Sequence, residues 1–193
     1  MWTALMIASL RGHFAIAGKL IEYNSGVNEV QIDGWSSLML ASQNGHFAIA
    51  DLLLKHGAEA NHEEREKWTS LLIASFENFS DLVELLIQIG VNVDHTNING
   101  WTSLMLAASK GNLATVERLM MYSPQINLRN NDGENALMIA SKAGHEDVVR
   151  CLLLCQADVN LTNDKWEMAL ILATSKEHSG IVELLCQNKA EVN

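Results

Sequence analysis

The chain has 193 residues, of which 48% are hydrophobic, and carries a formal net charge of −10 at pH 7. This acidity disfavours nucleic acids and anionic membranes as partners, because both are bound through basic patches. No apolar run approaches the ~18 residues that a membrane-spanning helix needs, and the first residues have no signal-peptide pattern. The excess of acid either attracts basic partners or serves solubility alone.

The chain has three cysteines, Cys151, Cys155 and Cys186. They are too few and too unevenly placed for a disulfide framework, so they indicate a reducing, intracellular setting. We therefore expect a cytoplasmic location. Attachment to a membrane through another part of a longer parent chain stays open.

A shift of 33 residues brings the sequence into register with itself. The registers that align hold Trp2, Trp35, Trp68 and Trp101; Leu5, Leu38, Leu71, Leu104, Leu137 and Leu170; and Ala8, Ala41, Ala74, Ala107, Ala140 and Ala173. A fixed period of this size is the signature of a repeat array, in which one helical unit stacks on the next. The core is then a row of interfaces between neighbouring units.

Each period predicts a turn followed by two short helices. The turn leads to a residue that can cap a helix N-terminus, and the first helix ends at a glycine that tolerates a left-handed backbone. The capping residues are Thr3, Ser36, Thr69, Thr102 and Asn135, and the terminating glycines are Gly12, Gly45, Gly111 and Gly144. Apolar pairs then mark the second helix, as in residues 49–54.

The recurring pattern DG-W-[TS]-x-L-M-x-A-S-x-x-GH…LLL-x-x-GA-x-x-N resembles the ankyrin repeat. The resemblance implies an all-α solenoid of stacked helix-turn-helix units whose β-turn fingers project and whose first helices line a concave face. We expect a single domain, residues 1–193. Its six repeats lie at approximately 1–31, 32–64, 65–97, 98–130, 131–163 and 164–193.

Some positions depart from the family pattern. Methionine replaces the usual histidine in Thr-Pro-Leu-His, and we expect Met6, Met39, Met105 and Met138 to fill the core instead. The third unit has Lys67 and Asn78 where its neighbours have glycine; asparagine tolerates a left-handed turn, so this turn should survive. In the sixth unit Trp166 and Glu177 take the glycine positions. That unit is predicted to have a distorted turn or displaced helices.

The sequence has no combination of residues that indicates catalysis, a metal or a cofactor. His13, His46 and His145 follow the terminating glycines and are about 8–10 Å apart in successive units, which is too far to share a metal. His56, His62, His95 and His178 lie near loops without ligand spacing, and Cys151 and Cys155 are expected to be packed or half-exposed thiols. The tail asparagines Asn61, Asn127 and Asn160 resemble family residues that hydrogen-bond a loop and, in some members, are hydroxylated. We expect a protein that is not an enzyme.

The tryptophans are the strongest candidates for binding. Trp35, Trp68 and Trp101 follow the turn position, where family members often contact partners, and tryptophan is a favoured hot-spot residue. The alternative is that each indole packs on the next turn and stiffens the array. Glu134 takes the tryptophan position in the fifth unit, so Trp101 and Glu134 together suit a lysine, arginine or methyl-lysine side chain.

A second set of candidates lies at the ends of the first helices, on the expected concave face: Gln43, Asn44, Phe76, Glu77 and Lys110. Phe76 is either an anchor for a partner or packs locally against Phe79. Together with the fingers, this face predicts a protein–protein interaction module that binds another protein, or an extended peptide with basic residues.

Two alternatives stay open. Neither end of the chain has the polar outer face of a capping repeat, which is expected of a segment of a longer array or of units that associate through their ends. The protein would otherwise be monomeric. Such a segment would be an architectural spacer in a larger scaffold, with contacts mainly to its own neighbours. No feature of the sequence indicates binding of a small ligand between the fingers.

Overall fold

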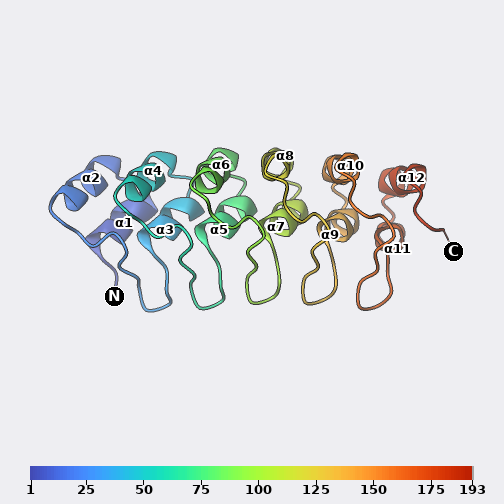
Figure 1. Ribbon diagram of the computed structural model, residues 1–193, viewed down its shortest axis with the longest axis horizontal. Helices are drawn as coiled ribbons and strands as arrows, with labels where there is room; N and C mark the ends of the chain where they lie inside the picture. Colours follow the sequence, from blue (N-terminus) through green and yellow to red (C-terminus); the bar gives the residue numbers. More distant parts are fainter. Residues whose placement is uncertain (193) are drawn as a thin grey trace. The chain divides into compact units, whose positions relative to one another are not determined.

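The computed structural model describes residues 1–192, which form short helices arranged in pairs (Figure 1). They fall into two compact units, Met1–Val93 and Asp94–Asn193. The first unit contains α1 (Ala4–Arg11), α2 (Phe14–Glu22), α3 (Ser37–Gln43), α4 (Phe47–Lys55), α5 (Ser70–Phe76) and α6 (Ser80–Gln88). The second contains α7 (Ser103–Lys110), α8 (Leu113–Met120), α9 (Ala136–Ala143), α10 (Glu146–Leu154), α11 (Ala169–Ser175) and α12 (Ser179–Gln187).

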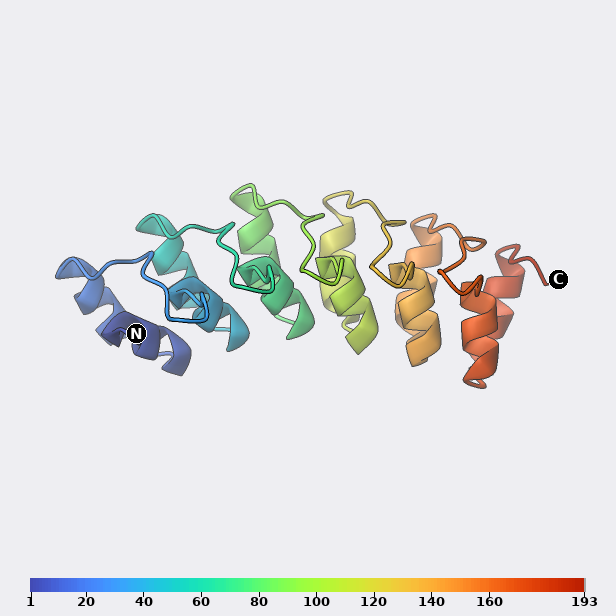
Figure 2. The ribbon, with the colours of Figure 1, turned by 90° about the horizontal axis from the view of Figure 1, so that it is seen from below.

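Within each unit the helices form two layers. In the first unit α1, α3 and α5 contact one another in order, and α2, α4 and α6 form the second layer against them. The second unit repeats this with α7, α9 and α11 in one layer and α8, α10 and α12 in the other. Figure 2 shows the first helices of each unit lying side by side. The predicted all-α repeat architecture is confirmed, whereas a single domain with six exact repeat boundaries stays a prediction.

The predicted caps start five of the first helices. The side-chain oxygens of Thr3, Ser36, Thr69, Thr102 and Asn135 accept hydrogen bonds from the backbone N–H three residues later, at 2.9–3.3 Å. Each bond satisfies a backbone donor that the helix itself leaves unpaired. The sixth first helix, α11, begins after Met168, which offers no such oxygen.

The core consists of the leucine and alanine registers together with the methionines. Leu71, Ala74 and Leu86 are at most 1% exposed, and the same positions in the other repeats are buried except for Leu20, which is half-buried. Met6, Met39, Met105 and Met138 are also at most 1% exposed. The prediction that methionine fills the volume of the usual histidine is therefore confirmed.

The fingers between helix pairs share one hydrogen-bonding pattern. In the finger at residues 64–68, the N–H of Glu64 donates to the carbonyl of Trp68, and the N–H of Lys67 donates back to the carbonyl of Glu64. The same two bonds recur in the fingers at residues 31–35, 97–101, 130–134 and 163–167. This pattern needs a left-handed residue at the fourth finger position, and Gly34, Lys67, Gly100, Gly133 and Trp166 all have positive φ.

The sixth repeat is not distorted, so that prediction is wrong. Trp166 and Glu177 adopt left-handed conformations with φ of 63° and 61°, close to those of the glycines that they replace. The finger keeps its two hydrogen bonds, and α11 packs on α9 and α12 as earlier first helices pack on theirs. Packing of the repeat therefore outweighs the cost of a left-handed side-chain residue, which is roughly 1–2 kcal/mol. Asn78, with φ of 67°, preserves the third repeat's turn as expected.

Histidines join successive repeats inside each unit. The Nε2 atoms of His46, His145 and His178 lie 3.1–3.3 Å from the carbonyl oxygens of Leu10, Ser109 and Lys142, near the ends of the preceding first helices. A structural role for His46 and His145 is thereby confirmed, whereas His178 belongs to the same register and is not an isolated loop residue. In the third repeat Phe79 takes this position, and its ring lies against Gly45 instead.

The tail asparagines also join neighbouring repeats. The side-chain oxygens of Asn28, Asn127 and Asn160 accept hydrogen bonds from the backbone N–H of the residue 31 positions later, at 2.9–3.0 Å. The structural role expected for Asn127 and Asn160 is thus observed. Among the described residues, no helix is both long enough and apolar enough to cross a bilayer.

Candidate functional site

A cleft of about 450 Å³ lies in the first unit, between the fingers at residues 31–35 and 64–68 and the ends of α3 and α5. We refer to it as the aromatic cleft. Its lining residues are Asp33, Trp35, Gln43, Glu64, Glu66, Trp68, Ile73, Phe76 and Glu77. Five of the nine residues predicted from sequence to bind a partner therefore lie together in this cleft.

The two fingers that border the aromatic cleft are in close contact. A Cβ atom added at Gly34 would lie 3.0 Å from the backbone Cα of Glu64, so only glycine fits this approach. Arg65 joins the fingers further: its Nη2 donates to the carbonyl of Ile32 at 2.7 Å, and its Nη1 lies 3.3 Å from Asp33 Oδ1. The positions of Trp35 and Trp68 are thus fixed by the close approach of the two fingers and by the side chain of Arg65.

The aromatic side chains of the cleft order one another. The Trp68 and Phe76 rings have centroids 6.0 Å apart and planes at 84°, an edge-to-face contact. Phe76 therefore packs against Trp68. Trp35, Trp68 and Phe76 are all half-buried. Each ring keeps part of its surface in the cleft.

The aromatic cleft is acidic. Its lining includes the carboxylates of Asp33, Glu64, Glu66 and Glu77 and no lysine or arginine. Glu64 Oε1 is used by the finger itself, because it accepts the backbone N–H groups of Glu66 at 2.8 Å and Trp68 at 3.0 Å. Apart from Asp33, which Arg65 approaches, none of these carboxylates forms an ion pair within residues 1–192.

Gln43 and Asn44 are adjacent at the end of α3, but they differ in role. Gln43 is exposed and lines the cleft. Asn44 does not line it: its Nδ2 donates to the carbonyl of Leu40 at 3.0 Å and completes the end of its own helix. This internal bond gives Asn44 a structural role.

The second unit has a cleft at the same repeat positions, three periods later. It has a volume of about 380 Å³, and we refer to it as the polar cleft. It is lined by Asn131, Asp132, Glu134, Lys142, Asn163, Asp164, Lys165, Glu167, Leu172 and Ser175. Glu134 and Glu167 stand where the aromatic cleft has Trp35 and Trp68, and Lys142 stands where it has Gln43.

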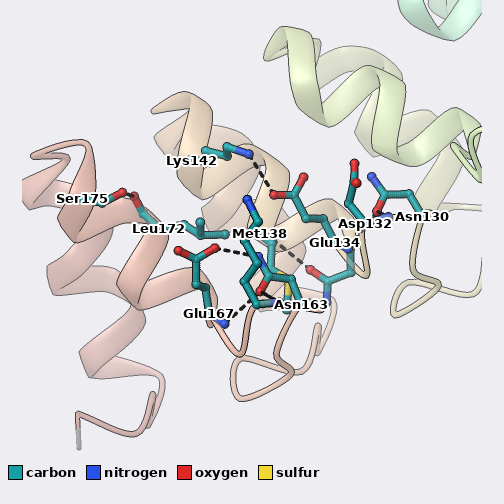
Figure 3. A network of polar contacts seen from close by, with 11 residues as sticks. Asn130, Asp132, Glu134, Met138, Lys142, Asn163, Glu167, Leu172 and Ser175 are labelled. Carbon is teal, nitrogen blue, oxygen red and sulfur yellow. Dashed lines mark hydrogen bonds and ion pairs between the residues drawn. The ribbon is translucent and has the colours of Figure 1, made fainter.

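Several carboxylates of the polar cleft have partners within the chain (Figure 3). Lys142 Nζ lies 2.9 Å from Glu134 Oε1, and Asn163 Nδ2 donates to Glu167 Oε2 at 3.0 Å. Arg129 Nη2 lies 2.8 Å from Asp164 Oδ1. Glu134 is only 8% exposed. It is therefore not the open carboxylate expected beside Trp101, because Lys142 from α9 already neutralises it.

The remaining predicted residues lie elsewhere on the second unit. Trp101 is half-buried on the finger at residues 97–101, where its backbone N–H donates to Asn97 Oδ1 at 3.0 Å. Lys110 is exposed at the last position of α7. Trp166 is 81% exposed and packs little on its neighbours.

No metal or redox site is visible among the described residues: no three histidine, cysteine or acidic side chains lie close enough together to hold a metal ion. All three cysteines are free thiols. Burial raises the pKa of Cys151 to about 11, with further contributions from the neighbouring Cys155 and Glu117. Such a thiol is protonated at neutral pH and is a poor nucleophile.

Sequence reasoning missed two features of these clefts. One is the contribution of Glu64 and Glu66, which stand out in the sequence only as part of a local acidic cluster, without a position relative to the tryptophans. The other is the row of buried finger asparagines, Asn97, Asn130 and Asn163. These asparagines are one period apart and each lies four residues before a tryptophan position, and this regular spacing could have identified them.

Pairs of short helices with a hairpin finger between consecutive pairs define a helical repeat protein of the solenoid class. The family described as "Ankyrin repeats (3 copies)" matches residues 1–64, 60–129 and 104–193. These matches span the whole sequence, so the chain belongs to the ankyrin repeat family. Ankyrin repeats are in general protein–protein interaction modules without enzymatic activity. No curated protein matches the sequence.

Proposed function

We propose that the chain binds a segment of another protein on the surface formed by the fingers and first helices of the first unit, with the aromatic cleft at its centre. The observation that carries this proposal is the grouping of Trp35, Gln43, Trp68, Phe76 and Glu77 in one cleft. Protein interfaces concentrate their binding energy in aromatic residues that sit in such hollows with a polar rim.

The charge of the cleft supports a basic partner. Complementary charge speeds the encounter of two proteins and selects among partners. The cleft is lined by four carboxylates, and Glu66 and Glu77 are exposed at its surface. We therefore propose an extended peptide segment, or a loop of a folded protein, with basic residues.

The second unit would contribute less to this partner. Trp101 and Lys110 offer an aromatic ring and a cation at the register positions of Trp35 and Asn44, so they are candidates for additional contacts. Glu134 would contribute to that surface only as a member of its ion pair with Lys142. We expect substitutions at Trp101 to weaken binding less than substitutions at Trp68.

An architectural role is the second candidate. Ile7 and Ile16 in the first repeat are 45% and 53% exposed, whereas the equivalent Leu40 and Ile49 in the second are 3% and 1% exposed. Ile171 of the last repeat is 43% exposed, against 1% for the equivalent Met138. Apolar side chains of this kind suit contacts with further repeats, and the chain would then act as a spacer.

We propose a monomer in the cytoplasm, unless these apolar end surfaces associate. The free thiols of Cys151, Cys155 and Cys186 support a reducing compartment. Analytical ultracentrifugation of the purified chain tests the oligomeric state. A dimer that dissociates on substitution of Ile171 by Glu would point to association through the ends.

Site-specific photo-crosslinking in cells tests the proposed binding surface. A benzophenone amino acid at Gln43, in the aromatic cleft, should capture a discrete partner. The matched controls place the same group at Lys142, the equivalent position of the polar cleft, and at exposed Gln88 on α6. Capture from Gln88 but not from Gln43 would contradict the proposal, and capture from neither position would favour the spacer.

A further inference from the structure

We propose that the aromatic cleft receives the guanidinium group of an arginine side chain from the partner segment. This inference rests on the proposed function, which supplies the partner, and it adds the chemistry of one subsite. Three features of the structure carry it: uncompensated carboxylates, ordered aromatic rings and an internal example of a cation in the equivalent cleft.

The uncompensated charge lies at the rim of the cleft. Glu66 lies on the finger at residues 64–68, where its backbone N–H donates to Glu64 Oε1. Glu77 is the C-cap residue of α5. Within the described residues, the carboxylates of Glu66 and Glu77 have no cationic partner. Arg65, which directly precedes Glu66 in the chain, is held by the carbonyl of Ile32 and by Asp33 on the neighbouring finger. The cleft therefore carries negative charge that the chain itself does not neutralise.

The aromatic walls favour a flat, weakly hydrated cation. Tryptophan gives the strongest cation–π attraction among the aromatic side chains, and the cleft contains both Trp35 and Trp68. The perpendicular contact with Phe76 fixes the orientation of Trp68 in advance. A guanidinium group stacks on such rings and still forms forked hydrogen bonds with carboxylates, whereas an ammonium group is more strongly hydrated and cannot do both.

The polar cleft shows where a cation lies in this architecture. Lys142 extends from the end of α9 and places its ammonium group 2.9 Å from Glu134, which occupies the position of Trp35 (Figure 3). In the aromatic cleft the residue equivalent to Lys142 is Gln43, which carries no charge. The place that the chain's own lysine fills in the second unit is thus left for a cation from outside in the first.

The test uses three peptides of the form acetyl-Gly-Ser-Xaa-Ser-Gly-amide, with arginine, lysine or citrulline as Xaa. Citrulline has the shape of arginine without its charge. Binding to the intact chain is followed through the indole N–H signals of its tryptophans in two-dimensional NMR spectra. The signals of Trp35 and Trp68 should move, and those of Trp2, Trp101 and Trp166 serve as internal references.

We expect the arginine peptide to bind at least about tenfold more tightly than the citrulline peptide, which is the range of a partly desolvated cation–π contact. The lysine peptide should fall between them. Equal binding of arginine and citrulline would overturn the inference, as would tighter binding of lysine than of arginine. Absence of any shift at Trp35 and Trp68 with the arginine peptide would overturn it too.

Charge-neutralising variants locate the site. Glu66→Gln and Glu77→Gln should each weaken binding of the arginine peptide several-fold without affecting the fold, because both side chains are exposed. The matched controls are Lys165→Gln and Lys176→Gln at the same register positions of the second unit, which should leave binding unchanged. Because removing a lysine makes the chain more acidic, a general response to net charge would strengthen binding in the two lysine variants by as much as the two glutamate variants weaken it. That outcome would overturn the assignment to the cleft.

A final pair of variants tests the comparison with Lys142. Gln43→Lys should place an internal cation in the aromatic cleft and abolish binding of the arginine peptide, whereas the uncharged Gln43→Met should weaken binding far less. If crosslinking from Gln43 captures a partner but arginine and citrulline peptides bind alike, the proposed function stands and this inference fails. If the arginine peptide binds in the cleft but crosslinking captures nothing there, the proposed function fails and the subsite remains.

Discussion

The aromatic cleft and the polar cleft lie at the same repeat positions, three periods apart, and differ almost only in their side chains. Trp35, Gln43 and Phe76 in the first correspond to Glu134, Lys142 and Ser175 in the second. The first leaves aromatic surface and charge open, and the second pairs Glu134 with its own Lys142 and bonds Glu167 to Asn163. The repeat fixes where a cleft lies, and a few variable positions decide whether a partner can use it.

The backbone beneath the two clefts is equivalent. Gly34 and Gly133 are both left-handed, and an added Cβ at either would press on the backbone of the next finger. The side-chain oxygens of Glu64 and Asn163 each accept two finger N–H groups at 2.8–3.0 Å. A glutamate can thus replace the asparagine of this turn, and it adds a carboxylate to the cleft in doing so.

The largest change in stability is expected from core substitutions, which test whether the repeats beneath the two clefts are equally well packed. Leu53 and Leu152 occupy the same register and are both fully buried. We expect Leu53→Ala and Leu152→Ala each to lower the free energy of unfolding by about 2–5 kcal/mol, through lost burial and the cavity left behind. Urea denaturation followed by circular dichroism measures both. A much smaller loss for one leucine would mean that the two cores differ.

The next effect concerns the left-handed finger positions beside the clefts. Lys67 and Trp166 are equivalent residues with φ of 61° and 63°. Replacing each by glycine should raise the free energy of unfolding, by roughly 1–2 kcal/mol at most. The gain should be clearer for Trp166→Gly, because that side chain is 81% exposed and has little packing to lose. Thermal denaturation measures the change, and a loss of stability at Trp166 would reveal packing of its indole.

A smaller effect separates the charges of the two clefts. Lys142→Met removes the partner of the nearly buried Glu134 and should destabilise the second unit by roughly 0.5–1 kcal/mol, in the range of partly exposed ion pairs. Gln43→Met, the matched change in the aromatic cleft, should leave stability unchanged. Chemical denaturation of both variants provides the comparison. Equal losses would mean that the contact of Lys142 with Glu134 contributes nothing specific.

The smallest effect uses the cysteines, all of which lie in the second unit. The pKa of Cys151 is raised to about 11 by burial and by Cys155 and Glu117. Because the unfolded thiol then ionises first, folding stability should fall as the pH rises from the ordinary thiol range towards 11. Maleimide should label the exposed Cys155 and Cys186 before Cys151, as peptide mass spectrometry can measure. Cys155→Ser should lower the pKa of Cys151, and faster labelling of Cys151 in the parent chain would contradict this order.

Much of the fold was predictable because the period repeats local rules. The caps, the glycine terminators and the buried methionines each follow from residue chemistry that recurs every 33 residues. The sixth repeat was mispredicted because local conformational preference at Trp166 and Glu177 was weighed without the packing energy of α11 and α12, which overrides it.

The candidate site was predictable in its aromatic members and in Glu77, but not in the pairing of its charges. Register alone places Trp35, Trp68 and Phe76 near one another. Glu134 and Lys142 are eight residues apart in the sequence, and their contact depends on the direction in which α9 leaves the finger. The period of the sequence does not specify that direction. The structural bond of Asn44 to Leu40 is similarly a matter of local geometry.

The absence of a histidine in the third repeat has a consequence for the plasticity of the aromatic cleft. At the ends of α1, α7 and α9 a histidine of the next repeat holds a backbone carbonyl. At the end of α3 the corresponding carbonyl belongs to Gln43, and Phe79 supplies an apolar contact to Gly45 in place of that bond. The last turn of α3 should therefore open at a lower free-energy cost than its counterparts. Such an adjustable turn would let Gln43 move aside as a partner side chain enters.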